Sequence, residues 1–178
     1  MRTACLTKVL VLSIALAGLV STAVYADTSR EYRLKAAYLL NFARFVYWPT
    51  ESFLSETDTF KICVYGESRF GENLNHLLSK KVQGRSIRII YKDDLRNISE
   101  CHILFVSESD KASYYKVASE VPRNVLTVSD VEGFSSEGGM IEFIRVDNKI
   151  KFEINVTQSI KSGIKFRSQL LEVAEKLR

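Results

Sequence analysis

Few side chains of this chain combine the residue types and the spacing that enzyme chemistry needs. Its two histidines, His76 and His102, lie in no metal-binding motif, and two imidazoles with a cysteine pair make a poor ligand set. No serine has the strand-to-helix elbow of a hydrolase nucleophile. The pair Asp93-Asp94 suits the capping of a turn or helix better than acid–base catalysis. The sequence therefore predicts neither catalytic nor metal-binding residues, and a structural role for both histidines.

The loop Gly66–Gly71 follows a run of apolar residues, as a phosphate-binding loop follows its strand. It lacks the Lys-Ser/Thr pair of a P-loop and the glycine spacing of a dinucleotide fingerprint, and Glu67 would repel phosphate. We interpret the loop as an ordinary turn between a strand and a helix. The sequence implies no cofactor.

Residues 1–26 have the three parts of a cleavable signal peptide. Arg2 and Lys8 give a positive start, Val9–Val20 an apolar core, and Val24-Tyr25-Ala26 a small-residue cleavage site. An uncleaved membrane anchor is the alternative, and the short apolar core argues against it. We expect export, with residues 27–178 forming one domain.

Export leaves two cysteines, Cys63 and Cys101, and one possible pairing between them. A cysteine pair in an exported chain is a disulfide candidate. The bridge would close a loop of about 38 residues and stabilise the fold by roughly 3–4 kcal/mol. Two buried free thiols are the alternative.

The charge balance excludes one class of partner. The chain has 25 basic and 21 acidic residues, and the loss of Arg2 and Lys8 with the signal leaves a net charge near +2. A nucleic-acid-binding protein normally shows a strong basic bias, so we expect no nucleic-acid partner.

Short apolar strands alternate with helices in the first two thirds of the exported chain. The predicted strands are Phe60–Tyr65, Ile87–Tyr91, His102–Val106 and Val125–Val128, and the predicted helices are Asn73–Lys81 and Asp110–Ser119. This alternation is typical of a parallel sheet with a layer on each face.

The pattern then changes to antiparallel. Met140–Val146 and Ile150–Val156 flank the turn Asp147-Asn148-Lys149, which predicts a hairpin, and Thr157–Gly163 and Gln169–Leu177 are predicted helices. The predicted fold is a three-layer α/β fold with a flavodoxin- or Rossmann-like, mainly parallel sheet and a C-terminal antiparallel hairpin. In the flavodoxin order the first and third strands are neighbours about 4.8 Å apart, which makes the cysteine bridge geometrically plausible.

The segment Arg30–Pro49 is unusually apolar. Between Ala36 and Trp48 only Asn41 and Arg44 are strongly polar, which is too apolar for a solvated helix and too short to span a bilayer. Pro49 disfavours the helical conformation of the residue before it, so the helix should end near Trp48. Either the sheet or another protein must cover this helix. We expect most of it to be core, with the Arg44–Trp48 end the most accessible part.

Two sets of residues are candidates for partner binding. The first set stands at the end of the apolar helix, where aromatic anchors could dock a partner: Asn41, Phe42, Arg44, Phe45, Tyr47 and Trp48. The second is Gly138-Gly139-Met140, where two glycines before a strand permit positive φ and a close backbone approach. A tight entry into the strand is the alternative for the second set.

Several short motifs occur in order along residues 31–177. They are Lys35-Ala36-Ala37-Tyr38, Asn41-Phe42-Ala43-Arg44-Phe45, Trp48-Pro49, Cys101-His102-Ile103-Leu104-Phe105, Val125-Leu126-Thr127-Val128-Ser129-Asp130, Gly133-Phe134, Gly138-Gly139-Met140-Ile141, Phe152-Glu153-Ile154-Asn155 and Leu170-Leu171. Together they resemble the YfiR family of exported bacterial proteins.

The resemblance implies a periplasmic α/β protein that regulates rather than catalyses. The characterised member holds an inner-membrane diguanylate cyclase inactive by binding its periplasmic sensor region. An outer-membrane, peptidoglycan-associated lipoprotein can sequester that repressor, and cyclic di-GMP and biofilm output then rise. The family also implies a homodimer and redox-sensitive disulfides. Cys63 and Cys101 match one cysteine pair of that member, whereas its second pair has no counterpart because no cysteine follows Cys101.

We therefore predict a periplasmic protein that is not an enzyme and that represses a membrane diguanylate cyclase. A small-ligand binder is the alternative, with a cleft at the carboxyl ends of the parallel strands lined by the Gly66 and Ser107–Ser109 loops. Regulation of another membrane receptor is a further alternative. The chain is short for the two-lobed architecture of typical solute receptors.

Overall fold

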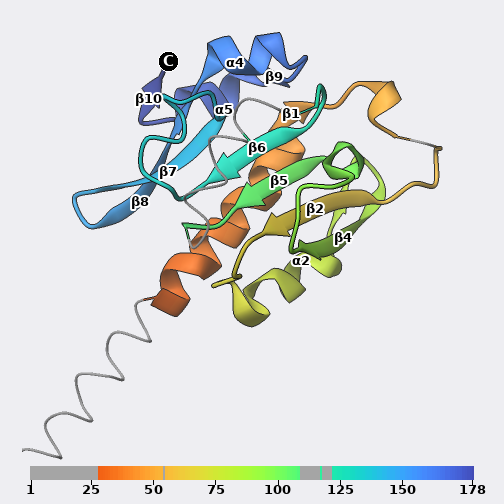
Figure 1. Ribbon diagram of the computed structural model, residues 1–178, viewed down its shortest axis with the longest axis horizontal. Coiled ribbons are helices and arrows are strands. Elements are labelled where there is room, and N and C mark those ends of the chain that lie inside the picture. The colour runs from red at the N-terminus through yellow and green to blue at the C-terminus, as the bar shows by residue number, and fades with distance from the viewer. Residues whose placement is uncertain (1–27, 54, 109–116, 118–121) are drawn as a thin grey trace, which may run out of the picture.

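A mainly parallel sheet of eight strands forms the centre of the computed structural model, which describes residues 28–53, 55–108, 117 and 122–178. The strands are β2 (Phe60–Tyr65), β3 (Lys81–Val82), β4 (Arg85–Lys92), β5 (Ile103–Val106), β6 (Leu126–Ser129), β7 (Ile141–Val146), β8 (Lys149–Ile154) and β10 (Lys176–Leu177). They lie in the order β10-β8-β7-β6-β5-β2-β4-β3 (Figure 1). A small second sheet pairs β1 (Val46–Tyr47) with β9 (Lys165–Phe166) in antiparallel fashion.

The parallel part of the sheet agrees with the predicted strand order. β2 pairs with β4 and β5, β5 pairs with β6, and β6 pairs with β7, all in parallel. Numbered along the chain, these five strands stand in the order 2-1-3-4-5 of flavodoxin-like sheets. The mixed α/β class is therefore confirmed. The helical layers are confirmed only in part, because the predicted helix Asp110–Ser119 lies outside the described residues except for Val117.

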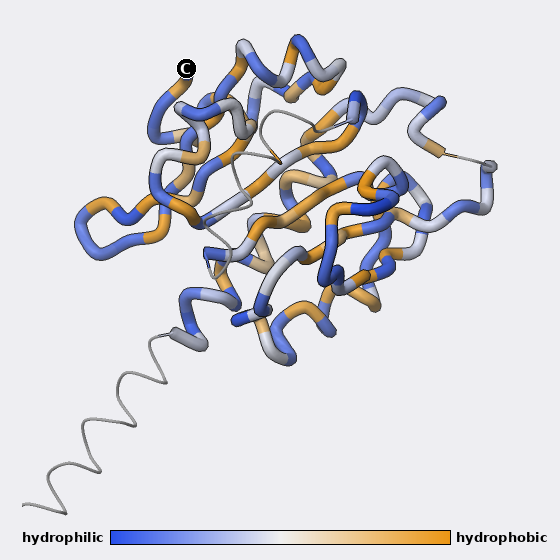
Figure 2. The backbone as a smooth tube through the Cα atoms, in the orientation of Figure 1, coloured by the Kyte–Doolittle hydropathy of each residue, from blue (hydrophilic) through white to orange (hydrophobic). Residues whose placement is uncertain are grey.

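The central strands are buried on both faces, as strands of a parallel sheet with a layer on each side must be. Every residue of β5 and β6 is buried, and Figure 2 shows β5 as hydrophobic. In β6, the apolar Leu126 and Val128 alternate with the small polar residues Thr127 and Ser129. In β2, Ile62 and Val64 belong to one hydrophobic cluster, whereas Cys63 belongs to a second cluster on the other face.

The N-terminal helix (residues 28–45) covers the first face of the sheet. Leu39, Phe42 and Ala43 are fully buried in the cluster that also contains Leu77 of α2 (Asn75–Leu78). Figure 1 shows this helix passing behind the central strands. The expectation that most of the apolar helix is core therefore agrees with its burial.

The C-terminal hairpin is confirmed. β7 and β8 pair antiparallel from Ile141 opposite Ile154 to Val146 opposite Lys149. Asp147 and Asn148 have φ values of 48° and 59°, the left-handed pair that a two-residue hairpin turn requires. The turn is thus one residue shorter than predicted. A second hairpin, between β3 and β4, was not predicted; its turn is Gln83-Gly84.

Three predicted helix boundaries are wrong. The N-terminal helix ends at residue 45 rather than near Trp48, because the next two residues form β1. The predicted helix Asn73–Lys81 is a short 3-10 turn, η2 (Gly71–Leu74), followed by α2. The predicted helix Gln169–Leu177 stops with α5 (Ser168–Glu172), and the chain continues into β10 beside β8.

The remaining elements are short. The helix predicted at Thr157–Gly163 is α4 (Val156–Lys161), capped by the side chain of Asn155, which accepts a hydrogen bond from Gln158 N. Two further 3-10 turns are η1 (Thr50–Ser52) and η3 (Ile98–Glu100). Among the described residues, no helix has the length and apolar character needed to cross a membrane. Residues 1–26 lie outside the described residues, so the signal peptide stays a prediction.

The predicted disulfide is present. Cys63 of β2 and Cys101, just before β5, are bonded with their Cα atoms 5.8 Å apart, and both residues are buried. Neighbouring parallel strands lie about 4.8 Å apart, which explains why the sheet order brings the cysteines together.

Candidate functional site

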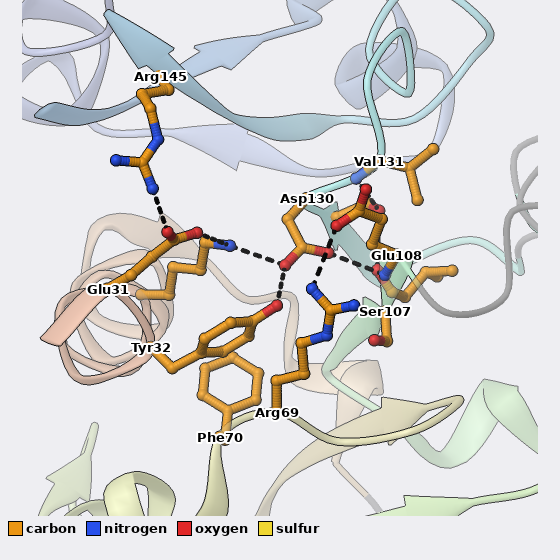
Figure 3. A network of polar contacts seen from close by, with 12 residues as sticks. Glu31, Tyr32, Arg69, Phe70, Ser107, Glu108, Asp130, Val131 and Arg145 are labelled. Atoms are coloured by element: carbon orange, nitrogen blue, oxygen red, sulfur yellow. Dashed lines mark hydrogen bonds and ion pairs between the residues drawn. The ribbon is translucent and has the colours of Figure 1, made fainter. Parts of the chain in front are cut away.

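A buried polar network lies where the carboxyl ends of β2, β5 and β6 meet the first turns of the N-terminal helix (Figure 3). In a sheet of this order, the crevice beside the first and third strands is where the connections change direction, and ligands usually bind there. This crevice is therefore the first place to look for function.

Asp130, directly after β6, is the centre of the network. Its Oδ2 accepts hydrogen bonds from the Tyr32 hydroxyl and from Lys35 Nζ, both at 2.7 Å, and its Oδ1 accepts from Glu108 N at 2.9 Å. The side chains of Lys35 and Asp130 are only 4% and 5% exposed. A buried ion pair of this kind is tolerated because each charge has a partner and the remaining hydrogen-bonding positions are used.

The network continues across the helix to β7. Glu31 forms an ion pair with Lys35 at 2.6 Å, one helical turn away, and a second ion pair with Arg145. The ammonium of Lys35 also lies 4.3 Å from the centre of the Tyr32 ring. Two carboxylates therefore neutralise one buried ammonium, and together they join the helix to two strands.

Tyr32 stays protonated in this setting. Burial, and next the negative charge of Asp130, raise the pKa of its hydroxyl well above the ordinary value. The hydroxyl therefore serves as a constant hydrogen-bond donor. Its ring packs edge-on against Phe70 with the centroids 5.1 Å apart, and Phe70 in turn contacts Phe105. These rings occupy the centre of the crevice, between the N-terminal helix and β5.

The two loops expected to line a ligand cleft are tied together. Ser107 Oγ donates to the carbonyl of Glu67 at 2.7 Å, and Arg69 lies 3.4 Å from the carboxylate of Glu108. Ser109 lies outside the described residues. A hollow of about 360 Å³ remains beside the network, and its lining includes five acidic residues and two basic ones.

The connection between β6 and β7 is held by a second buried carboxylate. Glu142 accepts hydrogen bonds from Gly133 N, Ser135 N and Ser135 Oγ, each at 2.9 Å. Backbone donors of this kind stabilise a carboxylate without a cation. Glu142 therefore fixes the loop that carries Gly138 and Gly139.

The backbone at the glycine candidates lies close to another part of the same chain, at Phe134, rather than at a surface for a partner. A Cβ atom on Gly139 would overlap the ring of Phe134, which is itself fully buried. Met140 is also fully buried, and Gly138 has a φ of 102°. These positions form a tight entry into β7, and only Gly138 is partly exposed.

The candidates at the end of the helix divide into two groups. Phe42 and Trp48 are buried and Phe45 is partly buried, whereas the three others, Asn41, Arg44 and Tyr47, are exposed. The indole of Trp48 donates to the carbonyl of Ala43 at 2.8 Å. The guanidinium of Arg167 lies 4.3 Å from the centre of the exposed Tyr47 ring.

The two histidines have different surroundings. His102 is buried between the rings of Phe53 and Phe60, and its Nδ1 accepts a hydrogen bond from Lys61 N at 3.0 Å. Burial lowers the pKa of its imidazole to about 4, so the ring is neutral at neutral pH. His76 is exposed on α2. Within the described part of the chain, no group of three or more His, Cys, Asp or Glu side chains could hold a metal ion.

Sequence reasoning missed the Asp130 network. Asp130 and Lys35 are 95 positions apart. The available signals were a carboxylate directly after a buried strand and a lysine among apolar helix residues. Neither signal identifies its partner.

The fold and the network together define a class of protein: a mixed α/β protein whose parallel sheet has its ligand crevice closed by its own N-terminal helix. A family model described as YfiR/HmsC-like matches residues 32–175, and the chain belongs to this family. The family is regulatory rather than catalytic. A comparison with curated proteins finds no match.

Proposed function

We propose that this protein acts in the periplasm, after export through its predicted signal peptide, and represses an inner-membrane diguanylate cyclase by binding the periplasmic sensor region of that enzyme. Repression would lower cyclic di-GMP and biofilm formation. Family membership supports this regulatory role. A homodimer, and sequestration of the repressor by an outer-membrane, peptidoglycan-associated lipoprotein, belong to the same proposal.

The closed crevice is the observation that favours protein binding over small-ligand binding. A ligand in the usual position would have to displace Lys35 from two carboxylates and separate the Tyr32 and Phe70 rings. Removing one partner from a buried ion pair costs about 3–5 kcal/mol. A small metabolite would have to offset that cost before it could bind.

The outer surface offers better anchors for a partner. Several large apolar side chains are exposed, including Tyr47 at the end of the helix. Arg44, also exposed, is separated from it along the chain by only two residues. Aromatic residues and arginine dominate the binding energy of most protein interfaces. Among the three exposed members of the first candidate set, Tyr47 and Arg44 therefore have the side chains best suited to anchor a partner.

The test is a pull-down of the tagged, exported protein from a membrane fraction after mild crosslinking. We expect a diguanylate cyclase to be recovered, and less of it with Tyr47→Ala and Arg44→Glu. Tyr91→Ala is the matched control, because Tyr91 is equally exposed on β4. Recovery of no membrane protein would contradict the proposal. Micromolar stabilisation by a metabolite in a thermal-shift screen would favour the small-ligand alternative.

A further inference from the structure

A groove of about 520 Å³ runs between the N-terminal helix, the β7–β8 hairpin and the residue that follows α5. Its apolar part is formed by Leu34, Ile150 and Val173, and its basic rim includes Arg30, Lys149 and Lys151. We call this surface the basic groove. It is distinct from the closed crevice, although Glu31, Arg145 and Ile150 border both hollows.

The walls of the basic groove are held in place by the protein itself. Tyr38 OH lies 3.5 Å from the carbonyl of Ile150, and the ion pair between Glu31 and Arg145 also joins the helix to the hairpin. The turn at the tip of the hairpin is a regular two-residue turn. A partner would therefore meet a preformed surface, which reduces the ordering cost of binding.

The apolar side chains of the basic groove are left exposed. Leu34 is 43% exposed and Val173 is 62% exposed. Neither belongs to the main core or to the side chains packed against it, whereas Tyr38 and Ile150 are partly buried and pack against that core. Exposed apolar side chains that line a concavity with a polar rim are typical of an interaction site.

The charges of the basic groove are not all balanced by the described part of the chain. Glu31 is the single acidic residue among its lining, and the carboxylate of Glu31 already pairs with Lys35 and Arg145. Lys151 lies 3.5 Å from Glu175. Arg30 and Lys149 form no ion pair with any other described residue. At Arg30 and Lys149 the rim therefore presents positive charge that no other described residue neutralises.

We propose that the basic groove binds an acidic, apolar segment of the cyclase's periplasmic region. Apolar side chains of that segment would cover Leu34 and Val173, and its carboxylates would pair with Arg30 and Lys149. The proposal rests on the proposed function and names the face and the chemistry of the contact. The concave shape favours a polypeptide segment over an anionic bilayer, because a bilayer surface cannot enter a groove.

The first test uses the periplasmic region of the cyclase recovered by the pull-down as the probe. The exported chain is titrated with it at two salt concentrations. We expect Arg30→Glu with Lys149→Glu to weaken binding about tenfold and to reduce its salt dependence, because rim charges act through long-range attraction. Leu34→Ser should weaken binding at both salt concentrations. Lys80→Glu and Tyr91→Ser are the matched controls, since both positions are exposed and lie outside the basic groove.

The outcomes separate the two proposals. If the cyclase binds and the groove variants match the unaltered protein, the groove assignment is wrong and the proposed function stands. If no cyclase is recovered, the proposed function is wrong, and the assignment of the basic groove to a cyclase segment is wrong as well. If phosphatidylglycerol vesicles bind the protein and the groove variants abolish that binding, the groove recognises lipid and the segment assignment is wrong. A photo-crosslinker at Leu34 that captures an acidic segment of the cyclase would support the assignment directly.

Discussion

The closed crevice and the basic groove both border Glu31, but they differ in how their charged side chains are paired. In the crevice, Lys35, Asp130 and Tyr32 satisfy one another and are almost completely buried. In the basic groove, Arg30 and Lys149 remain without an ion-pair partner among the described residues. Charges that are paired inside a protein contribute to its architecture, whereas unpaired surface charges are available for recognition. The comparison predicts that crevice substitutions change stability and groove substitutions change binding.

The largest effect should follow Asp130→Asn. The substitution leaves Lys35 buried with only Glu31 as a counter-charge, and we expect a loss of about 3–5 kcal/mol in the free energy of unfolding. Urea denaturation measures this loss. The double variant Asp130→Asn with Lys35→Met should cost less than the sum of the two single changes, because it leaves no uncompensated charge. If the loss in the double variant equals the sum of the losses in the two single variants, Asp130 and Lys35 are not energetically coupled.

Removal of the disulfide should have the next largest effect. Cys63→Ala with Cys101→Ala is expected to lower the free energy of unfolding by roughly 3–4 kcal/mol. Because both cysteines are buried, we also expect mild reductant to leave the folded protein oxidised. Thiol labelling with and without denaturant checks this second point. Rapid reduction of the native protein would show that the bridge is accessible and open to redox control.

Acidification should destabilise the interior through His102. The pKa of the His102 imidazole is about 4 in the folded protein, whereas its ordinary value, which applies to the unfolded chain, is 6.5. Between pH 4 and pH 6.5 the unfolded chain therefore binds the proton more readily than the folded protein does. Stability should therefore fall by about 2–3 kcal/mol as pH drops from 6.5 to 4, and this contribution should level off below pH 4. His102→Asn should remove this part of the pH profile. His76→Gln, at the exposed histidine, is the control for the loss of an imidazole outside the interior.

Gly139→Ala should cost about 1–3 kcal/mol, the usual range for forcing an extra methyl group into a packed site. The new Cβ would meet the buried ring of Phe134. Phe134→Leu should relieve part of that cost in the double variant, and thermal unfolding measures both. An equal cost with and without the ring would contradict the packing explanation.

Groove substitutions should have the smallest effect on stability. Leu34→Ser and Val173→Ser change exposed side chains, so we expect the free energy of unfolding to stay within about 0.5 kcal/mol of the unaltered protein. Far-UV circular dichroism during thermal unfolding provides the measurement. A loss as large as that of Asp130→Asn would show that these residues support the fold, and the distinction between crevice and groove would fail.

The strands could be predicted from the sequence because their signals are local. Phe60–Tyr65 is apolar except for Lys61 and is β2 in the structure, and the hairpin follows from two β-rich runs around a short polar turn. The last helix shows the limit of such signals. Leu170, Leu171, Ala174 and Leu177 have helical spacing, yet residues 176 and 177 pair with Glu153 and Ile154 of β8. Pairing with the edge of β8, more than twenty residues earlier in the sequence, therefore stabilises a strand at residues 176 and 177 in spite of the helical spacing of the apolar residues.

The candidate sites show the same limit. The apolar helix was recognised, but its spacing could not say that Phe42 and Trp48 are buried while Arg44 and Tyr47 are exposed. Exposure depends on where β1 meets β9, and β9 lies more than a hundred residues later. The Asp130 network was missed for the same reason, because nothing in the sequence around Lys35 or Asp130 indicates that these two residues form an ion pair.

The sequence by itself determined the α/β alternation, the terminal hairpin and the family, because these depend on residue types and on neighbours close along the chain. The tertiary structure decided which charges are neutralised internally and which side chains of the N-terminal helix remain free for a partner. Burial and ion pairing depend on residues brought together from distant parts of the chain. Lys35 is therefore part of the interior, while Arg30, little more than one helical turn earlier, borders the basic groove.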